Sequence, residues 1–125
     1  MRALNILAAT ALVGVALATP AHAKSVDVVG TTSCTGGVVA KFKAGPRDVA
    51  QIQSEVQIDD VGKTRNLWTI TVVDGGQTAS ATVRTGGASN SASAKFFTAD
   101  NSGADTLTFT ATRAGASCTG TVTVP

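Results

Sequence analysis

The chain has 125 residues, of which 43% are hydrophobic, 4% aromatic and 14% charged, with a formal net charge of +2 at pH 7. This length suits one domain with a single core. A charge so close to balance argues against nucleic acid or an anionic membrane as the partner.

The N-terminus has the features of an export signal. Arg2 supplies a positive start, residues 4–18 form a mostly apolar run, and the tripeptide AHA at 21–23 gives the small-x-small pattern that precedes a cleavage site. The apolar run is shorter than the roughly 20 residues that span a bilayer, which disfavours a membrane anchor. We therefore predict a signal peptide at 1–23 and a secreted mature domain at 24–125, with no membrane association after cleavage.

Cleavage would leave 102 residues (125 less 23), with nine Lys and Arg against eight Asp and Glu. The two cysteines, Cys34 and Cys118, both lie in the exported part, 84 residues apart. An oxidising compartment favours a disulfide between them over two free thiols. In the chain-entropy treatment, a bridge closing a loop of this size stabilises the fold by about 4–5 kcal/mol at most.

Alternation with a period of two is the main pattern of the mature chain. Between 50 and 58 the apolar and small residues occupy even positions, and glutamine and glutamate occupy odd ones, as in a strand with one buried face. Trp68 is in phase with apolar neighbours, which indicates a core position, and Cys118 is likewise in phase with Val122 and Val124. The same pattern predicts seven or eight short strands, near residues 26–28, 38–42, 50–58, 68–72, 79–83, 92–96, 107–111 and 118–124.

Glycine-rich turn clusters separate the expected strands, among them 45–48, 75–76 and 86–87. Gly36-Gly37 is expected to bend the chain after Cys34. We find no stretch with a helical period. The sequence therefore predicts an all-β fold, an immunoglobulin-like antiparallel β-sandwich with one disulfide, and a small barrel is the alternative.

Four segments carry a resemblance to a set of small secreted actinobacterial proteins of unassigned function. The segments are SVDVVGTTSC, VVAKFKAGPRDVAQIQSEVQID, WTITVVDGG and ADNSGADTLTFTATRAGASCTGTVTV. The resemblance covers essentially the whole mature chain and implies an immunoglobulin-like sandwich, without active residues to transfer. GADTLTFTAT also resembles the penultimate strand of bacterial immunoglobulin-like adhesion modules. The chain differs from antibody domains because it has no tyrosine, and because Trp68 lies 34 residues after Cys34.

The mature chain lacks the residues on which most catalytic sites depend. It contains no histidine, tyrosine or methionine, and both cysteines are expected in the disulfide. Serine and threonine nucleophiles need a nearby base, and zinc and copper sites draw on histidine or thiolate. We therefore predict a protein that is not an enzyme, with no catalytic residue, no metal and no cofactor.

Acidic residues in turn-like segments are the remaining chemical candidates. Asp59-Asp60 and the pair Asp100 and Asp105 are the closest carboxylates, but turn and capping roles are favoured over glycoside hydrolysis. The DNSGAD segment at 100–105 offers oxygen ligands for calcium. It supplies about three of the six or more that calcium takes, which favours turn chemistry here too.

Three residues are candidate partner contacts: Phe97, Lys41 and Lys43. Adjacent strand residues point to opposite faces, so either Phe96 or Phe97 faces outward, and Phe97 is either exposed or covered by a loop or the second sheet. Lys41 and Lys43 share a strand face opposite Phe42. They suit either a polyanionic cell-wall polymer or plain solvation.

Together these features predict a secreted, non-catalytic binding module with an unknown protein or cell-surface partner. One alternative is an inhibitor of an extracellular hydrolase that acts through one rigid loop. The other is a small-ligand carrier with a cleft between its sheets.

Overall fold

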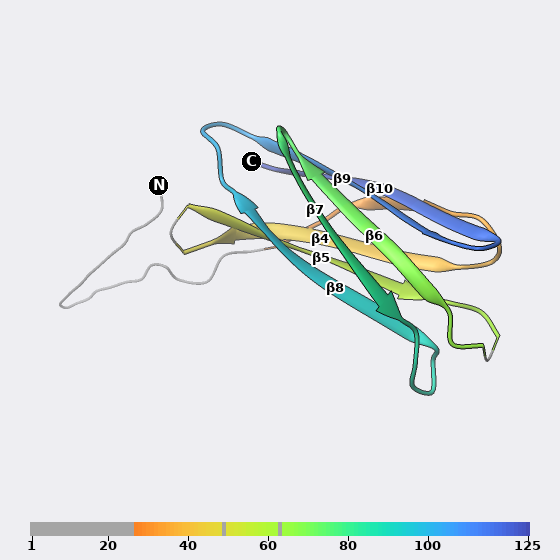
Figure 1. Ribbon diagram of the computed structural model, residues 1–125. Helices are drawn as coiled ribbons and strands as arrows, with labels where there is room; N and C mark the ends of the chain where they lie inside the picture. The colour runs from red at the N-terminus through yellow and green to blue at the C-terminus, as the bar shows by residue number, and fades with distance from the viewer. Residues whose placement is uncertain (1–26, 49, 63) are drawn as a thin grey trace, which may run out of the picture.

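The computed structural model describes residues 27–48, 50–62 and 64–125, and the predicted signal peptide and its cleavage site lie outside these ranges. Nine strands, and no helix, occur in the described part of the chain (Figure 1). They are β2 (Val28–Val29), β3 (Thr31–Cys34), β4 (Val39–Arg47), β5 (Gln51–Asp59), β6 (Leu67–Asp74), β7 (Gln77–Arg84), β8 (Ser91–Ala99), β9 (Asp105–Arg113) and β10 (Ala116–Val124).

The strands form two antiparallel sheets that pack face to face. One has the order β3-β10-β9-β6-β7 and the other the order β2-β4-β5-β8. The predicted immunoglobulin-like β-sandwich is confirmed. The described residues form nine strands rather than the expected seven or eight, because the first described strand segment is split between the two sheets.

Gly30 is the point at which the first strand changes sheets. Its backbone N–H donates to the Phe42 carbonyl oxygen at 2.8 Å, continuing the edge of β4. The next residues pair with β10 in the other sheet. A Cβ at Gly30 would collide with the Thr121 carbonyl oxygen and lie 2.9 Å from the Val122 Cβ. Only glycine lets the chain pass this closely.

Strand β4 runs through Gly45, Pro46 and Arg47, which the sequence placed in a turn. The turn lies just beyond, where Ala50 has a φ of 54°. The Phe42 carbonyl oxygen, which accepts from the Gly30 N–H, points to the β2 side of β4. Pro46 is an even number of residues further along the strand, so its backbone groups point to the same side. Strand β2 covers only Lys43 and Ala44. The missing N–H of Pro46 therefore faces the β2 side, beyond the part of β2 that the structure describes, and proline interrupts none of the described ladder bonds.

The core lies between the sheets and follows the predicted alternation. Strand β6 reads exposed, buried, exposed, buried along its first four residues. Trp68 is fully buried, as predicted, and the Phe42 and Phe109 rings meet edge to face with centroids 4.8 Å apart. The other fully buried apolar side chains come from both sheets: Ala44, Ile52, Val56, Ile58, Ile70, Val72, Leu107 and Ala111.

The predicted disulfide between Cys34 and Cys118 is present. The two cysteines are directly opposite each other on β3 and β10. Cys118 is 1% exposed, so its sulfur faces the core, as its phase predicted. The bridge therefore joins neighbouring strands of one sheet, near the two ends of the described part of the chain, whereas the antibody-type bridge spans two sheets.

Candidate functional site

The three candidate contacts, Phe97, Lys41 and Lys43, lie on one surface. Lys41 and Lys43 belong to β4 and Phe97 to β8, with β5 between them, so all three face outward from the four-stranded sheet. The register places Lys43 opposite Glu55, and Glu55 opposite Lys95. We call this surface the cationic face; it comprises Lys41, Lys43, Arg47, Gln51, Gln53, Glu55, Gln57, Lys95 and Phe97.

Phe97 is the exposed member of the adjacent phenylalanine pair. It is 56% exposed, whereas Phe96 is 5% exposed and packs into the core. Neither a loop nor the second sheet covers Phe97, which settles the choice that the sequence left open. An apolar ring of this size among amide and ammonium groups is the kind of anchor that protein interfaces use.

Ion pairs neutralise part of the cationic face. The Lys43 Nζ lies 3.5 Å from the Glu55 Oε1 and 3.9 Å from the Asp27 Oδ2, and the Arg47 Nη2 lies 3.0 Å from the Asp27 Oδ1. Lys95 makes no ion pair with the residues that the structure describes. The uncompensated charge of this face is therefore positive.

The charge of Lys41 is one of the influences on the pKa of Asp59, the carboxylate at the end of β5. The pKa of Asp59 is held below its ordinary value, chiefly because the Ser91 hydroxyl donates to it, with help from Gln57 and from the charge of Lys41. Burial works in the opposite direction and is outweighed. Asp59 thus stays ionised beside Lys41 at the border of the cationic face.

A groove of about 410 Å³ adjoins the cationic face where the first strand leaves the sheet. Val29 forms one side, and Lys41, Lys43 and Gln57 contribute polar groups. The Thr32 hydroxyl donates to the Ala40 carbonyl at 2.8 Å across this gap, which ties β3 to β4. The groove has the volume of a small-molecule pocket, but it lies at the surface rather than between the sheets.

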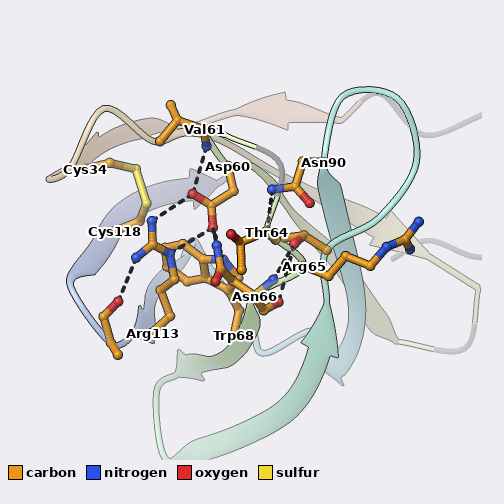
Figure 2. Close-up of polar contacts among 12 residues, drawn as sticks. Cys34, Asp60, Val61, Thr64, Arg65, Asn66, Trp68, Asn90, Arg113 and Cys118 are labelled. Carbon is orange, nitrogen blue, oxygen red and sulfur yellow. Dashed lines mark hydrogen bonds and ion pairs between the residues drawn. A yellow bond between two sulfur atoms is a disulfide. The ribbon is translucent and has the colours of Figure 1, made fainter.

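A second polar cluster, which the sequence analysis missed, is centred on Asp60 (Figure 2). The carboxylate is fully buried and accepts five hydrogen bonds. Two come from Arg113, Nε to Oδ2 at 2.8 Å and Nη2 to Oδ1 at 2.9 Å. The Trp68 indole N–H (3.0 Å), the Asn66 amide (2.9 Å) and the Val61 backbone N–H (2.8 Å) supply the others.

This cluster holds Asp60 permanently ionised. The Arg113 guanidinium is the largest cause that keeps the pKa of Asp60 far below its usual range, followed by the neutral donors, which together outweigh desolvation. Asp60 also raises the pKa of Arg113. The guanidinium carbon sits 5.6 Å from the centre of the Trp68 ring. The five donors occupy the carboxylate and tie it to the loop after β5, to Trp68 and to the end of β9.

The alternation of buried and exposed positions along β5 and β9 indicates that both members of this ion pair face the core. Asp60 continues the inward parity of β5, and Arg113 continues the inward parity of β9. Opposite charges at core positions of two strands need each other as partners. Because they come from different sheets and lie 53 residues apart, no local motif joins them.

A third cluster is buried around Asp74 and Asp105. Asp74 accepts from the Thr98 hydroxyl at 2.7 Å, and Asp105 accepts from the Asn101 amide at 3.2 Å. Burial raises the pKa of Asp74, the Thr98 bond opposes this, and the charge of Asp105 adds to it. In the described ranges, no three His, Cys, Asp or Glu side chains gather as a metal site would require.

Comparison with protein-family models, with curated proteins and with solved structures found no match to this chain. Within the described residues, no helix has both the length and the apolar character needed to span a membrane.

Proposed function

We propose that this protein is an exported, non-catalytic binding module whose partner binds the cationic face. The main support for this binding surface is that Phe97 is 56% exposed on the same sheet face as Lys41, Lys43 and Lys95. An exposed aromatic ring bordered by cations combines an apolar anchor with charges that set orientation and speed of encounter. The adjoining groove offers room for a partner side chain.

The partner that fits this face is a protein with an apolar pocket opposite Phe97 and acidic side chains opposite Lys41 and Lys95. Charge alone would serve a polyanionic wall polymer equally well. The aromatic ring contributes most where it enters a desolvated pocket, which a folded protein supplies, whereas stacking on a sugar of the polymer would cover only one face of the ring. A contribution from Phe97 therefore favours a protein over a polymer.

The test captures ligands on the immobilised mature domain from two fractions of the exporting cells, surface proteins and protein-free wall polymer. We expect the protein fraction to contain a ligand that Phe97→Ser loses and that Leu67→Ser retains. Leu67 is the matched control because it is 49% exposed, but on the other sheet. Binding of polymer alone, unchanged by Phe97→Ser, would contradict a protein partner.

Charge is tested in the same assay. The double substitution of Lys41 and Lys95 by glutamine should slow association and weaken its dependence on salt. Arg84→Gln changes a cation on the opposite sheet and should have little effect. An effect of Arg84→Gln half as large as that of the double variant, in proportion to the charge removed, would mean that only net charge matters and would remove the cationic face as the site.

Export is the second part of the proposal. The predicted cleavage after Ala23 is supported by the AHA pattern at 21–23, and the Cys34–Cys118 disulfide is compatible with an extracellular location. N-terminal sequencing of protein from the culture medium should read Lys24 first. A cell-associated product that retains Met1 would contradict export.

A further inference from the structure

The outer face of the five-stranded sheet is covered by hydroxyl side chains. Along β6, β7, β9 and β10, the positions that point away from the core carry threonine or serine, except at Leu67, Val73 and Arg84. Arg84, at the end of β7, is the single charged residue at these positions. Protein surfaces ordinarily carry about 25–35% charged residues, so this surface, which we call the hydroxyl face, departs from the usual composition.

The longest ordered part of the hydroxyl face lies on β9 and β10. The antiparallel register of these two strands opposes three pairs of threonines, Thr106 and Thr123, Thr108 and Thr121, and Thr110 and Thr119. All six side chains are exposed. We call these six residues the threonine grid.

The spacing of the threonine grid follows from the hydrogen bonds of β10. The Ser117 carbonyl oxygen accepts from the Thr35 N–H, on the β3 side of the strand. Odd-numbered residues of β10 therefore direct their backbone groups towards β3, and the threonine pairs are non-hydrogen-bonded pairs of the β9–β10 ladder. The Cα atoms of such a pair lie about 4.5 Å apart, and successive pairs lie about 6.8 Å apart along the strands. The grid is therefore periodic in two directions.

The hydroxyl groups are held in place before any ligand arrives. Threonine is β-branched, which restricts its first side-chain torsion. The Thr106 and Thr123 hydroxyls bond to each other at 3.1 Å, and the Thr71 and Ser80 hydroxyls do so at 2.8 Å. A bonded pair of hydroxyls still has a donor and acceptor positions for outside groups. Binding to this face would therefore cost little side-chain entropy.

The composition of the hydroxyl face restricts the ligand to one that is neutral, polar and periodic. A face with one charge at its border does not attract polyions. Its outward positions carry no aromatic ring on which a sugar could stack or a protein could anchor. The net gain from each hydroxyl hydrogen bond is small, because the bond replaces one to water. The ligand must therefore bond to many hydroxyls at once and repeat with their spacing.

We propose that the hydroxyl face binds ice, with the threonine grid at the centre of the contact. Oxygen atoms in the ice lattice repeat along one crystal axis at nearly the distance that separates the opposed threonines. Hydroxyl groups donate and accept hydrogen bonds, as water molecules do, so those of the grid take the places of water molecules at the ice surface. The methyl groups of the same threonines fill openings between the lattice molecules.

The twist of the sheet sets the size of the contact. Neighbouring strands rotate by about 20–25°, so four strands cannot all lie against one flat ice surface. The threonine grid belongs to two neighbouring strands of nine residues each and forms the contact. Strands β6 and β7 extend the hydroxyl face at an angle to it. A long charged side chain on the grid would hold the ice surface away, whereas the same side chain on the other sheet would not.

Partition into slowly growing ice tests the proposal on the full mature domain. The solution is partly frozen onto a cold probe, and the protein in the ice is compared with the protein left in the liquid. The wild type should enter the ice, from which a non-binding protein is excluded. Thr110→Lys places a long cation on the grid and should lose this incorporation. Ser93→Lys adds the same charge at an exposed position of the other sheet and should retain it.

A second grid variant guards against misfolding of the first. Thr121→Lys makes the same change on β10 and should also be excluded from ice, and thermal midpoints show which variants are folded. Exclusion of the wild type at every growth rate, or incorporation of the folded grid variants equal to that of Ser93→Lys, would overturn the proposal. Cosedimentation with an insoluble neutral polysaccharide that Thr110→Lys abolishes, with the wild type excluded from ice, would assign the face to a polysaccharide instead. These outcomes do not depend on what binds the cationic face.

Discussion

The Arg113 guanidinium donates two hydrogen bonds to the Asp60 carboxylate, from Nε to Oδ2 at 2.8 Å and from Nη2 to Oδ1 at 2.9 Å. Asp60 follows β5 in the four-stranded sheet, and Arg113 ends β9 in the five-stranded sheet. The ion pair therefore fastens one sheet to the other, beside the disulfide (Figure 2). It also keeps the loop after Asp60 in place, through the Val61 N–H and the Asn66 amide.

Removing the guanidinium should destabilise the fold strongly. Arg113→Met retains much of the side-chain volume but leaves the buried Asp60 charge without its counter-ion, a loss that should be several times that of an exposed ion pair. Urea denaturation of the oxidised protein measures the loss. Asp59→Asn, a change at the neighbouring half-exposed carboxylate, should cost less than about 1 kcal/mol. Similar losses for the two variants would show that the ion pair contributes little.

The same ion pair predicts acid sensitivity. The pKa of Asp60 is lower in the folded state than in the unfolded chain, so its contribution is present above about pH 4 and is lost as the pH falls further. The free energy of unfolding should decline below pH 4 in the wild type. Asp60→Asn should start lower at neutral pH and show a shallower decline. Parallel pH profiles for the two proteins would contradict this assignment.

Asp74 should act in the opposite sense. Burial raises its pKa in the folded state, so ionisation disfavours the fold, and its stabilising contribution is lost as the pH rises through that value. Asp74→Asn retains an oxygen for the Thr98 hydroxyl and removes the charge. We expect this variant to unfold at higher urea than the wild type at pH 7, with a difference that shrinks below pH 4. A less stable variant at pH 7 would contradict the direction of the pKa shift.

Gly120 is expected to tolerate no side chain. A Cβ there would collide with the Phe109 ring and lie 2.6 Å from the Thr31 carbonyl oxygen. Overpacking of this kind costs about 1–3 kcal/mol, so Gly120→Ala should lower the thermal midpoint clearly. Gly76→Ala is the control, since a Cβ at that turn residue meets no atom within 4 Å. Equal midpoints for the two variants would contradict the close approach of β9 and β10.

The strands could be predicted because alternation is visible in the local sequence. The disulfide could be predicted because two cysteines leave a single possible pairing. Alternation placed Trp68 in the core, and two cysteines allow one internal bridge. Long-range arrangement was harder to foresee. The division of the first strand depends on how closely Gly30 passes β10, and the strand position of Pro46 depends on how far β2 extends. Neither neighbour is visible in the local sequence.

The candidate surface was predictable in part for the same reason. Alternation put Lys41 and Lys43 on one strand face and left open whether Phe97 was exposed or covered. That Phe97 shares this face follows from the order of β4, β5 and β8, which the sequence does not specify. The phase of Asp60 and Arg113 indicated buried charges, but only the packing of the two sheets shows that they pair.

The position of the binding surface can be measured by amide chemical-shift mapping of the mature domain, titrated with the surface protein that it captures. We expect the resonances that move to belong to β4, β5 and β8, with Lys41, Lys95 and Phe97 among them, while Thr110 on the opposite sheet stays unchanged. Perturbations confined to a single loop would instead favour an inhibitor of a hydrolase, and perturbations centred on the five-stranded sheet would contradict the cationic face as the binding site.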